Sequence, residues 1–190
     1  MKIIITNNIA LNGGDAAILL GMVKVLKLRF GNNTQFVVTG TYPEICSRLY
    51  PEFKWRSTIG READSTPYNQ IRFIGRIARL LKRYRYYFAA FLKRFHIPLY
   101  RFLICKYDAD TLDEYATSDY IFSSGGTYLI EPYGIDSQYI DYRISLILGK
   151  PLIQYTQSMG PFTREQTKRR LRRIFNHCHT IFLRDRESAK

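Results

Sequence analysis

The segment KIIITNNIALNGGDAAILL, residues 2–20, decides the fold that we expect. Residues 2–6 form an apolar run that is typical of a buried parallel strand, and the pair Gly13 and Gly14 follows it. A helical pattern then continues to Leu28 and ends near Gly31. A strand, a glycine turn and a helix in this order indicate the opening unit of a parallel α/β sheet.

The same alternation continues along the chain. We predict further strands at residues 35–39, 120–123, 152–155 and 180–183, and helices at 43–49, 136–148 and 163–176. Thr163 and Gln166 fit a capping box at the start of the last of these helices. Residues 61–70 are polar and are the predicted flexible loop. This order predicts the α/β class, with one Rossmann-like domain over residues 1–190 whose parallel sheet is flanked by helices.

Composition excludes several classes of protein. Hydrophobic residues make up 46% and aromatic residues 15% of the 190, which excludes a disordered chain. No uncharged apolar run approaches the ~18 residues of a membrane-spanning helix, and no signal peptide is visible, so we expect a cytoplasmic protein. Cys46, Cys105 and Cys178 are widely spaced, which favours reduced thiols over a disulfide framework or a zinc site.

One segment carries most of the positive charge. The net charge is +13, and residues 71–106 contain ten Lys or Arg and no Asp or Glu. The rest of the chain carries 19 basic and 16 acidic residues, a net charge of +3. We therefore treat residues 70–106 as a basic amphipathic insertion in the domain.

Apolar and basic residues separate on a helical wheel of this insertion. The apolar ones recur at steps of three and four: Ile74, Ile77, Leu81, Tyr84, Phe88, Phe91 and Phe95. Six basic residues fall roughly opposite: Arg72, Arg76, Arg79, Arg83, Lys93 and Arg94. Arg85 lies near the apolar side. The pattern predicts contact of these six residues with an anionic membrane, with a solvated basic face as the alternative; without a recognition motif, nucleic acid is not an expected partner.

Glycine-rich and polar loops follow the predicted strands, at the place where open α/β sheets bind ligands. The first loop contains Asn12, Gly13, Gly14 and Asp15. Its glycines let the backbone approach a ligand closely, and the helix N-terminus offers N–H groups to an anion. Simple capping of the helix by Asp15 is the alternative interpretation.

Later loops offer a second set of polar groups. Gly125, Gly126 and Thr127 follow the strand at residues 120–123, and small or hydroxyl residues there suit phosphate or carboxylate oxygens. Gln157 and Ser158 lie where the strand at 152–155 ends. A tight turn and a polar connector are the respective alternatives. Arg184, after the last strand, could hold a carboxylate through two parallel hydrogen bonds.

Together these loops carry a family resemblance. NGGDAAI at residues 12–18, SSGGTYL at 123–129, QSMGPF at 157–162 and RDRES at 184–188 resemble the polysaccharide pyruvyl transferase family in wording and spacing. Residues 55–110 match only loosely. The resemblance implies the N-terminal domain of a two-domain protein of the glycosyltransferase-B type, with the active site between two Rossmann-like halves. We expect the second, C-terminal half to be absent from this chain.

The resemblance also implies a chemistry. Phosphoenolpyruvate is the co-substrate, there is no resident cofactor, and the enolpyruvyl group moves onto sugar hydroxyls to form a pyruvate ketal in exopolysaccharide or capsule biosynthesis. Arg184 is expected at the carboxylate or phosphate of the donor, and Asn12 and Asp15 at the acceptor sugar. The full set of expected substrate-binding residues is Asn12, Gly13, Gly14, Asp15, Gly125, Gly126, Thr127, Gln157, Ser158 and Arg184.

No residue of this chain is expected to be the general acid, which the resemblance assigns to the second half. His96, His177 and His179 lie outside the family motifs and are expected to be structural, and no metal site is predicted. The expected partners are a lipid-linked or nucleotide-linked glycan acceptor and the inner face of the cell membrane, where the protein would be peripheral. Three alternatives stay open: a glycosyltransferase-B-type nucleotide-sugar transferase, a non-catalytic membrane-associated glycan-binding fragment, and a chain that is inactive without its second half.

Overall fold

The computed structural model describes residues 1–60, 72–133 and 135–189. Its described strands form one sheet in the order β3-β2-β1-β4-β6-β5, with β7 also paired to β6, and every pairing is parallel. The strands are β1 (Lys2–Asn8), β2 (Gln35–Gly40), β3 (Lys54–Ser57), β4 (Tyr120–Ser123), β5 (Gly126–Leu129), β6 (Leu152–Met159) and β7 (Thr180–Leu183). The helices are α1 (Gly13–Phe30), α2 (Pro43–Leu49), α3 (Arg72–Arg94), α4 (Tyr100–Leu103), α5 (Lys106–Thr117), α6 (Asp136–Ile147) and α7 (Glu165–Phe175).

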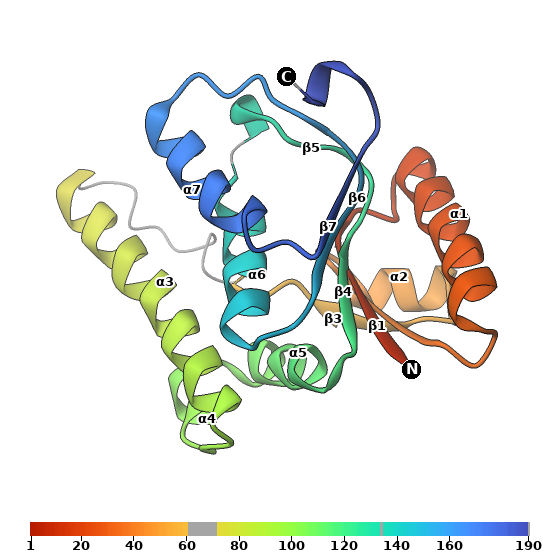
Figure 1. Cartoon of the computed structure of the whole chain (residues 1–190). Coiled ribbons are helices and arrows are strands. Elements are labelled where there is room, and N and C mark those ends of the chain that lie inside the picture. Colours follow the sequence, from red (N-terminus) through yellow and green to blue (C-terminus); the bar gives the residue numbers. More distant parts are fainter. Residues whose placement is uncertain (61–71, 134, 190) are drawn as a thin grey trace.

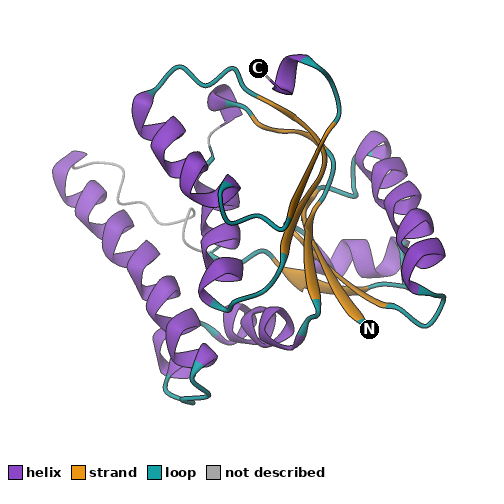
Figure 2. Ribbon diagram, in the orientation of Figure 1, coloured by secondary structure: helices purple, strands orange, loops and turns teal. Residues whose placement is uncertain are grey.

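Helices cover both faces of the sheet (Figures 1 and 2). α1 and α2 lie on one face, while α5, α6 and α7 lie on the other, with α3 outermost on that side. A hydrophobic core lies on each face of the sheet. Side chains of β1 enter both cores, because successive residues of a strand point to opposite faces. Ile3 and Ile5 pack in the core beneath α1, and Ile4 packs in the core beneath α5 and α6. The predicted α/β class, a parallel sheet flanked by helices, is confirmed.

Some elements differ from the prediction. β3 and α5 were not predicted because their sequences, KWRS and KYDADTLDEYAT, are polar and lack a clear apolar period. β6 does not end at residue 155 but continues to Met159, so Gln157 and Ser158 lie inside a strand. The chain after Ser123 is not all loop either, because Gly126–Leu129 returns to the sheet as β5. The predicted flexible loop at residues 61–70 lies outside the described residues.

The predicted capping box of α7 is wrong. α7 begins at Glu165, its N-cap is Arg164, and no side chain of the N-cap residue bonds to the helix. Thr163 lies one residue too early, and its hydroxyl donates to Glu131 Oε2 at 2.6 Å. Glu131 Oε1 accepts from the backbone N–H of Arg164 at 2.9 Å, so a distant carboxylate holds the start of this helix.

Two general properties complete the fold. The three cysteines, all in the described ranges, form no disulfide in the structure. Within the described parts of the chain, no helix combines the length and the apolar character needed to cross a bilayer.

Candidate functional site

Three neighbouring strands lose their regular pairing at one level of the sheet. Thr6, Ser123 and Gln154 form the last regular row across β1, β4 and β6. Beyond this row, the register of β1 with β2 shifts before Asn8, and the register of β6 with β7 shifts before Gln157. β4 ends in the same row, before the chain re-enters the sheet as β5. Such irregularities are frequent next to active sites, where they redirect side chains.

Backbone strain coincides with this level. Asn7 has a φ of 60° and Thr156 a φ of 46°, both in the left-handed region. Asn adopts this region comparatively easily, whereas β-branched Thr is strained there. A Cβ on Gly125 would lie 2.4 Å from Thr156 Oγ1. The segments that contain Gly125 and Thr156 therefore approach each other more closely than any side chain at position 125 permits. Strain of this kind persists only where the surroundings hold it, and it clusters at functional sites.

The left-handed turn directs two successive side chains of β1 toward α6. Thr6 Oγ1 donates to Asp141 Oδ2 at 2.8 Å, and Asn7 Nδ2 contacts Tyr142 OH at 3.0 Å and Ser123 Oγ at 3.1 Å. In a regular strand these two side chains would point to opposite faces. The bulge therefore builds a polar cluster between β1, β4 and α6 inside an otherwise apolar core.

Gln157 joins this cluster from β6. Its Nε2 donates to Ser124 O at 2.8 Å and to Ser123 Oγ at 2.5 Å, and Ser123 Oγ also lies 2.8 Å from Tyr142 OH. All four of these residues are fully or almost fully buried. The sequence placed Gln157 in the site, and the structure brings it together with the loop that contains Gly125.

Asn8 links the cluster to the first predicted loop. Its Nδ2 donates to Ser124 Oγ at 3.3 Å and to Asp15 O at 3.4 Å. β1 lies between β2 and β4, so the chain leaves β1 toward one side of the sheet and returns on the other. This is the topological switch point, where open α/β sheets bind ligands at the carboxyl ends of their strands.

Three buried oxygen atoms of the cluster have no hydrogen-bond partner among the described residues: Asn8 Oδ1, Asp141 Oδ1 and Gln157 Oε1. The amides of Asn8 and Gln157 donate to backbone carbonyls, which only accept, so the amide oxygens are the free atoms. A buried acceptor without a donor costs roughly 1–3 kcal/mol. The three atoms are enclosed by the protein, so a donor from a ligand reaches them only if the overlying chain moves.

Titration of the cluster follows from its burial. Complete burial raises the pKa of Asp141 to about 7, although the hydrogen bond from Thr6 works in the opposite direction. Burial likewise raises the pKa of Tyr142 above its ordinary value. Near neutral pH the cluster thus contains one carboxyl group that is balanced between its protonated and ionised forms.

In the first loop, Asn12 caps α1. Its Oδ1 accepts from Gly14 N at 3.1 Å, and Gly13 is the first residue of the helix. Asp15 lies in the first helical turn and is not the cap, so the alternative interpretation assigned the capping to the wrong residue. All four predicted residues of this loop lie at the carboxyl end of β1, beside Asn8.

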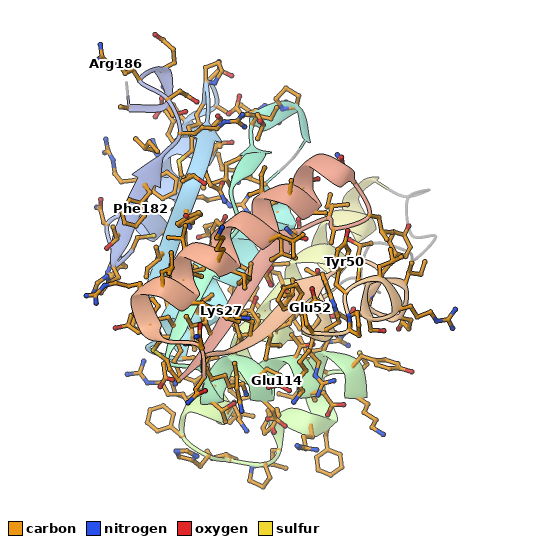
Figure 3. The ribbon with its side chains drawn as sticks, turned by 90° about the vertical axis from the view of Figure 1, so that its right-hand side faces the viewer. Lys27, Tyr50, Glu52, Glu114, Phe182 and Arg186 are labelled. Atoms are coloured by element: carbon orange, nitrogen blue, oxygen red, sulfur yellow. The ribbon has the colours of Figure 1, made fainter. Side chains whose placement is uncertain are left out.

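The last residues of β6 and the loop after β7 are tied together. Ser158 Oγ donates to Asp185 Oδ2 at 2.6 Å, and the backbone N–H of Arg184 donates to Gln157 O at 3.2 Å. The hydrogen bond from Ser158 lowers the pKa of Asp185, with Ser188 adding to the effect. The Arg184 side chain is exposed, and so is Thr127. Arg186, in the same loop, marks this end of the molecule in Figure 3, opposite Glu114.

The histidines lie outside the cluster. His177 Nδ1 lies 2.8 Å from Arg173 O, and His179 Nδ1 lies 3.0 Å from Thr180 Oγ1. His96 follows the end of α3 and is exposed. In the ranges that the structure describes, no group of three or more His, Cys, Asp or Glu side chains is arranged to hold a metal ion.

Sequence reasoning missed the centre of the cluster. Asn7 and Asn8 could have been noticed as two amides directly after the apolar run of β1. Asp141 and Tyr142 carry no such signal, because they lie in a mixed polar and apolar stretch that resembles any amphipathic helix. Only the bulge in β1 brings Thr6 and Asn7 against them.

Comparison with known proteins identifies the family of the chain. The family model described as polysaccharide pyruvyl transferase matches residues 12–190, which include all four loops at the carboxyl ends of the strands. No curated protein and no solved structure matches the chain. Because the match covers nearly the whole sequence, the chain belongs to the polysaccharide pyruvyl transferase family.

Proposed function

We propose that this chain contributes to a site that transfers the enolpyruvyl group of phosphoenolpyruvate to a sugar and forms a pyruvate ketal. The observation that carries the proposal is the buried cluster of amide and hydroxyl groups at the switch point between β1 and β4. It lies at the end of the sheet where the family motifs converge. Surface-polysaccharide or capsule synthesis is the setting that we propose for the product.

The reaction sets clear requirements. Protonation of the methylene carbon of phosphoenolpyruvate leaves positive charge at the central carbon. One sugar hydroxyl attacks this carbon, phosphate leaves, and a second hydroxyl closes the cyclic ketal. The site must therefore hold the carboxylate and phosphate with cations, and must orient two neighbouring hydroxyl groups.

The cluster suits the acceptor sugar better than the anionic donor. Asn8 Oδ1 and Gln157 Oε1 are hydrogen-bond acceptors without donors among the described residues, and sugar hydroxyls are donors. A phosphate or carboxylate oxygen would be repelled by the same two atoms. We therefore assign the acceptor to this end of the sheet, where Asn12 is exposed and Asp15 half-buried, with Asn8 and Gln157 buried behind them.

Arg184 is our candidate for the donor. Its side chain is exposed directly after β7, and its backbone is bonded to Gln157, so it lies beside the cluster. A guanidinium can bind a carboxylate or phosphate through two parallel hydrogen bonds. Ser158, bonded to Asp185, lies on the adjoining stretch of β6.

The test is turnover with defined substrates. This chain, combined with the C-terminal half that the family resemblance implies, is incubated with phosphoenolpyruvate and a panel of nucleotide-linked and lipid-linked sugars, and both phosphate release and the ketal product are measured. We expect equal amounts of phosphate and ketal. Arg184→Ala should lower kcat/KM for phosphoenolpyruvate at least tenfold, about 1.4 kcal/mol of transition-state stabilisation.

Arg172→Ala is the matched control, because Arg172 is an exposed arginine on α7 and lies outside the family motifs. Its kcat/KM should equal that of the wild type. Transfer of a sugar from a nucleotide sugar, without consumption of phosphoenolpyruvate, would refute pyruvyl transfer and indicate a glycosyltransferase.

A further inference from the structure

The solvent-facing side of α3 is apolar. Five side chains along it are between 49% and 66% exposed, and they form what we call the aromatic stripe: Leu81, Tyr84, Phe88, Phe91 and Phe95. The ring centroids of Phe91 and Phe95 are 4.8 Å apart. The stripe is long for a surface that faces water, and contiguous apolar patches of this kind mark interaction sites.

The opposite side of α3 holds the helix on the domain. Tyr86, Ala89 and Ala90 are buried, and α3 packs on α6, α4 and α5. Two cations also face the domain: Arg83 Nη2 lies 2.9 Å from Asp136 Oδ1, and Lys93 Nζ lies 2.5 Å from Asp113 Oδ1. Two of the six predicted membrane contacts therefore form ion pairs with carboxylates of the same domain. The side chains of Arg72, Arg76 and Arg79 lie outside the described residues.

Two exposed arginines flank the stripe. At about 100° per residue, Arg85 and Arg94 fall on its two sides, each about 90° from its centre. The side chains of Arg85 and Arg94 are both exposed. Arg94 Nη1 also donates to Ile147 O at 2.9 Å. A further exposed aromatic residue and a further exposed arginine lie next to the end of α3, namely Phe102 of α4, which is 87% exposed, and Arg101. The arrangement is an apolar centre with a cationic rim.

We propose that the aromatic stripe docks on the surface of an anionic lipid bilayer, with its rings between the acyl chains and Arg85 and Arg94 at the lipid phosphates. The charge of the segment selects this occupant, because residues 71–106 contain ten basic and no acidic residues. Interfacial helices combine aromatic insertion with electrostatic attraction to anionic headgroups in this way. A second copy of the chain is disfavoured, because it would bring two strongly basic segments together. This inference does not depend on the proposed function.

Vesicle co-sedimentation tests the proposal. The protein is mixed with vesicles of phosphatidylcholine alone, or of phosphatidylcholine with phosphatidylglycerol. We expect at least tenfold tighter binding to the anionic vesicles, and about a tenfold loss for Arg85→Gln/Arg94→Gln and for Phe88→Ser/Phe91→Ser. Two matched controls should bind like the wild type: Arg172→Gln/Arg173→Gln on α7, and Leu28→Ser at an exposed leucine of α1.

A gain-of-signal variant keeps the test independent of any loss of folding. Phe91→Trp places a fluorophore in the stripe, whereas Trp55 is buried on the other face of the sheet. Anionic vesicles with brominated phosphatidylcholine should quench the emission of Phe91→Trp but not of Leu28→Trp. Equal quenching of both, equal loss of binding in the α7 control, or a dimer of the wild type that Phe88→Ser/Phe91→Ser dissociates would each overturn the proposal.

Discussion

Asp141 lies in α6 with no exposed surface, and its Oδ2 accepts a hydrogen bond from Thr6 Oγ1 at 2.8 Å. In the unfolded chain its carboxyl group ionises near pH 3.8, whereas burial raises its pKa in the folded chain to about 7. Between these two pH values the unfolded state releases a proton that the folded state keeps. The contribution of Asp141 to the free energy of unfolding is therefore fully present below about pH 4 and is lost as the pH rises to about 7.

Asp141→Asn should remove this pH dependence. The amide oxygen can still accept from Thr6, but the side chain no longer ionises. Relative to the wild type, we expect the variant to gain up to about 4 kcal/mol in the free energy of unfolding at about pH 8, and little or nothing at about pH 4. Urea unfolding at the two pH values measures the difference. The same difference at both would mean that burial of the carboxyl is not its cause.

Gly125 is required by the close approach of Thr156. A methyl group at position 125 would lie 2.4 Å from Thr156 Oγ1 and 3.1 Å from the carbonyl oxygens of Tyr155 and Thr156. Gly125→Ala should therefore lower the free energy of unfolding by about 1–3 kcal/mol, because β4 and β6 must separate. Gly13→Ala is the control, since a Cβ there meets nothing within 4 Å. Equal stability of the two variants in urea would contradict this account.

At the scale of elements, Glu114 of α5 connects two strands at their amino ends. It forms ion pairs with Lys2 of β1, with Lys54 of β3 at 2.6 Å and with Arg56 of β3 at 3.0 Å. Its side chain is 7% exposed. Burial opposes ionisation of Glu114, but the hydrogen bonds and charges of Lys2 and Lys54 outweigh it and lower the pKa to about 2. Glu114 lies at the end of the molecule opposite Arg186 (Figure 3).

Glu114→Gln should destabilise the fold because it leaves three neighbouring cations unpaired. We expect a loss of about 1–3 kcal/mol near pH 7, measured by urea unfolding, with the candidate site unaffected. A lowered pKa stabilises the folded state above about pH 4.5, and this stabilisation is lost as the pH falls toward about 2. The deficit of the variant should therefore shrink in acid. Glu165→Gln, which breaks an exposed pair with Lys168, should cost less than about 0.5 kcal/mol.

Elements with a strong hydrophobic period could be predicted, and the others could not. β1, β2, β4 and β7 are short runs rich in β-branched or aromatic residues, and local sequence is enough to recognise them. β3 and α5 depend on tertiary partners, such as the ion pairs of Glu114. For α3, the helical wheel drawn from the sequence separated apolar from basic residues correctly. It could not tell which of these two sides of the helix faces water.

At the scale of the whole molecule, the position of the site could be predicted but its inner composition could not. Parallel α/β topology places the loops after the strands at one edge, so the loops of Asn12, Gly125, Gln157 and Arg184 were expected there. The buried cluster depends instead on a bulge in β1 that faces α6. Contacts such as Thr6 with Asp141 join residues 135 positions apart, and no local pattern records them.

One sheet separates two cores, which should unfold together because β1, β2, β4 and β6 each contribute side chains to both. Ile4 is fully buried in the core beneath α5 and α6, whereas Trp55, the single tryptophan, is buried in the core beneath α1 and α2. Ile4→Ala should lower the free energy of unfolding by about 2–5 kcal/mol. If the sheet couples the cores, Trp55 fluorescence and far-ultraviolet circular dichroism should report one midpoint, shifted equally by the variant. An unchanged Trp55 transition, with circular dichroism alone shifted, would show that the two layers unfold separately.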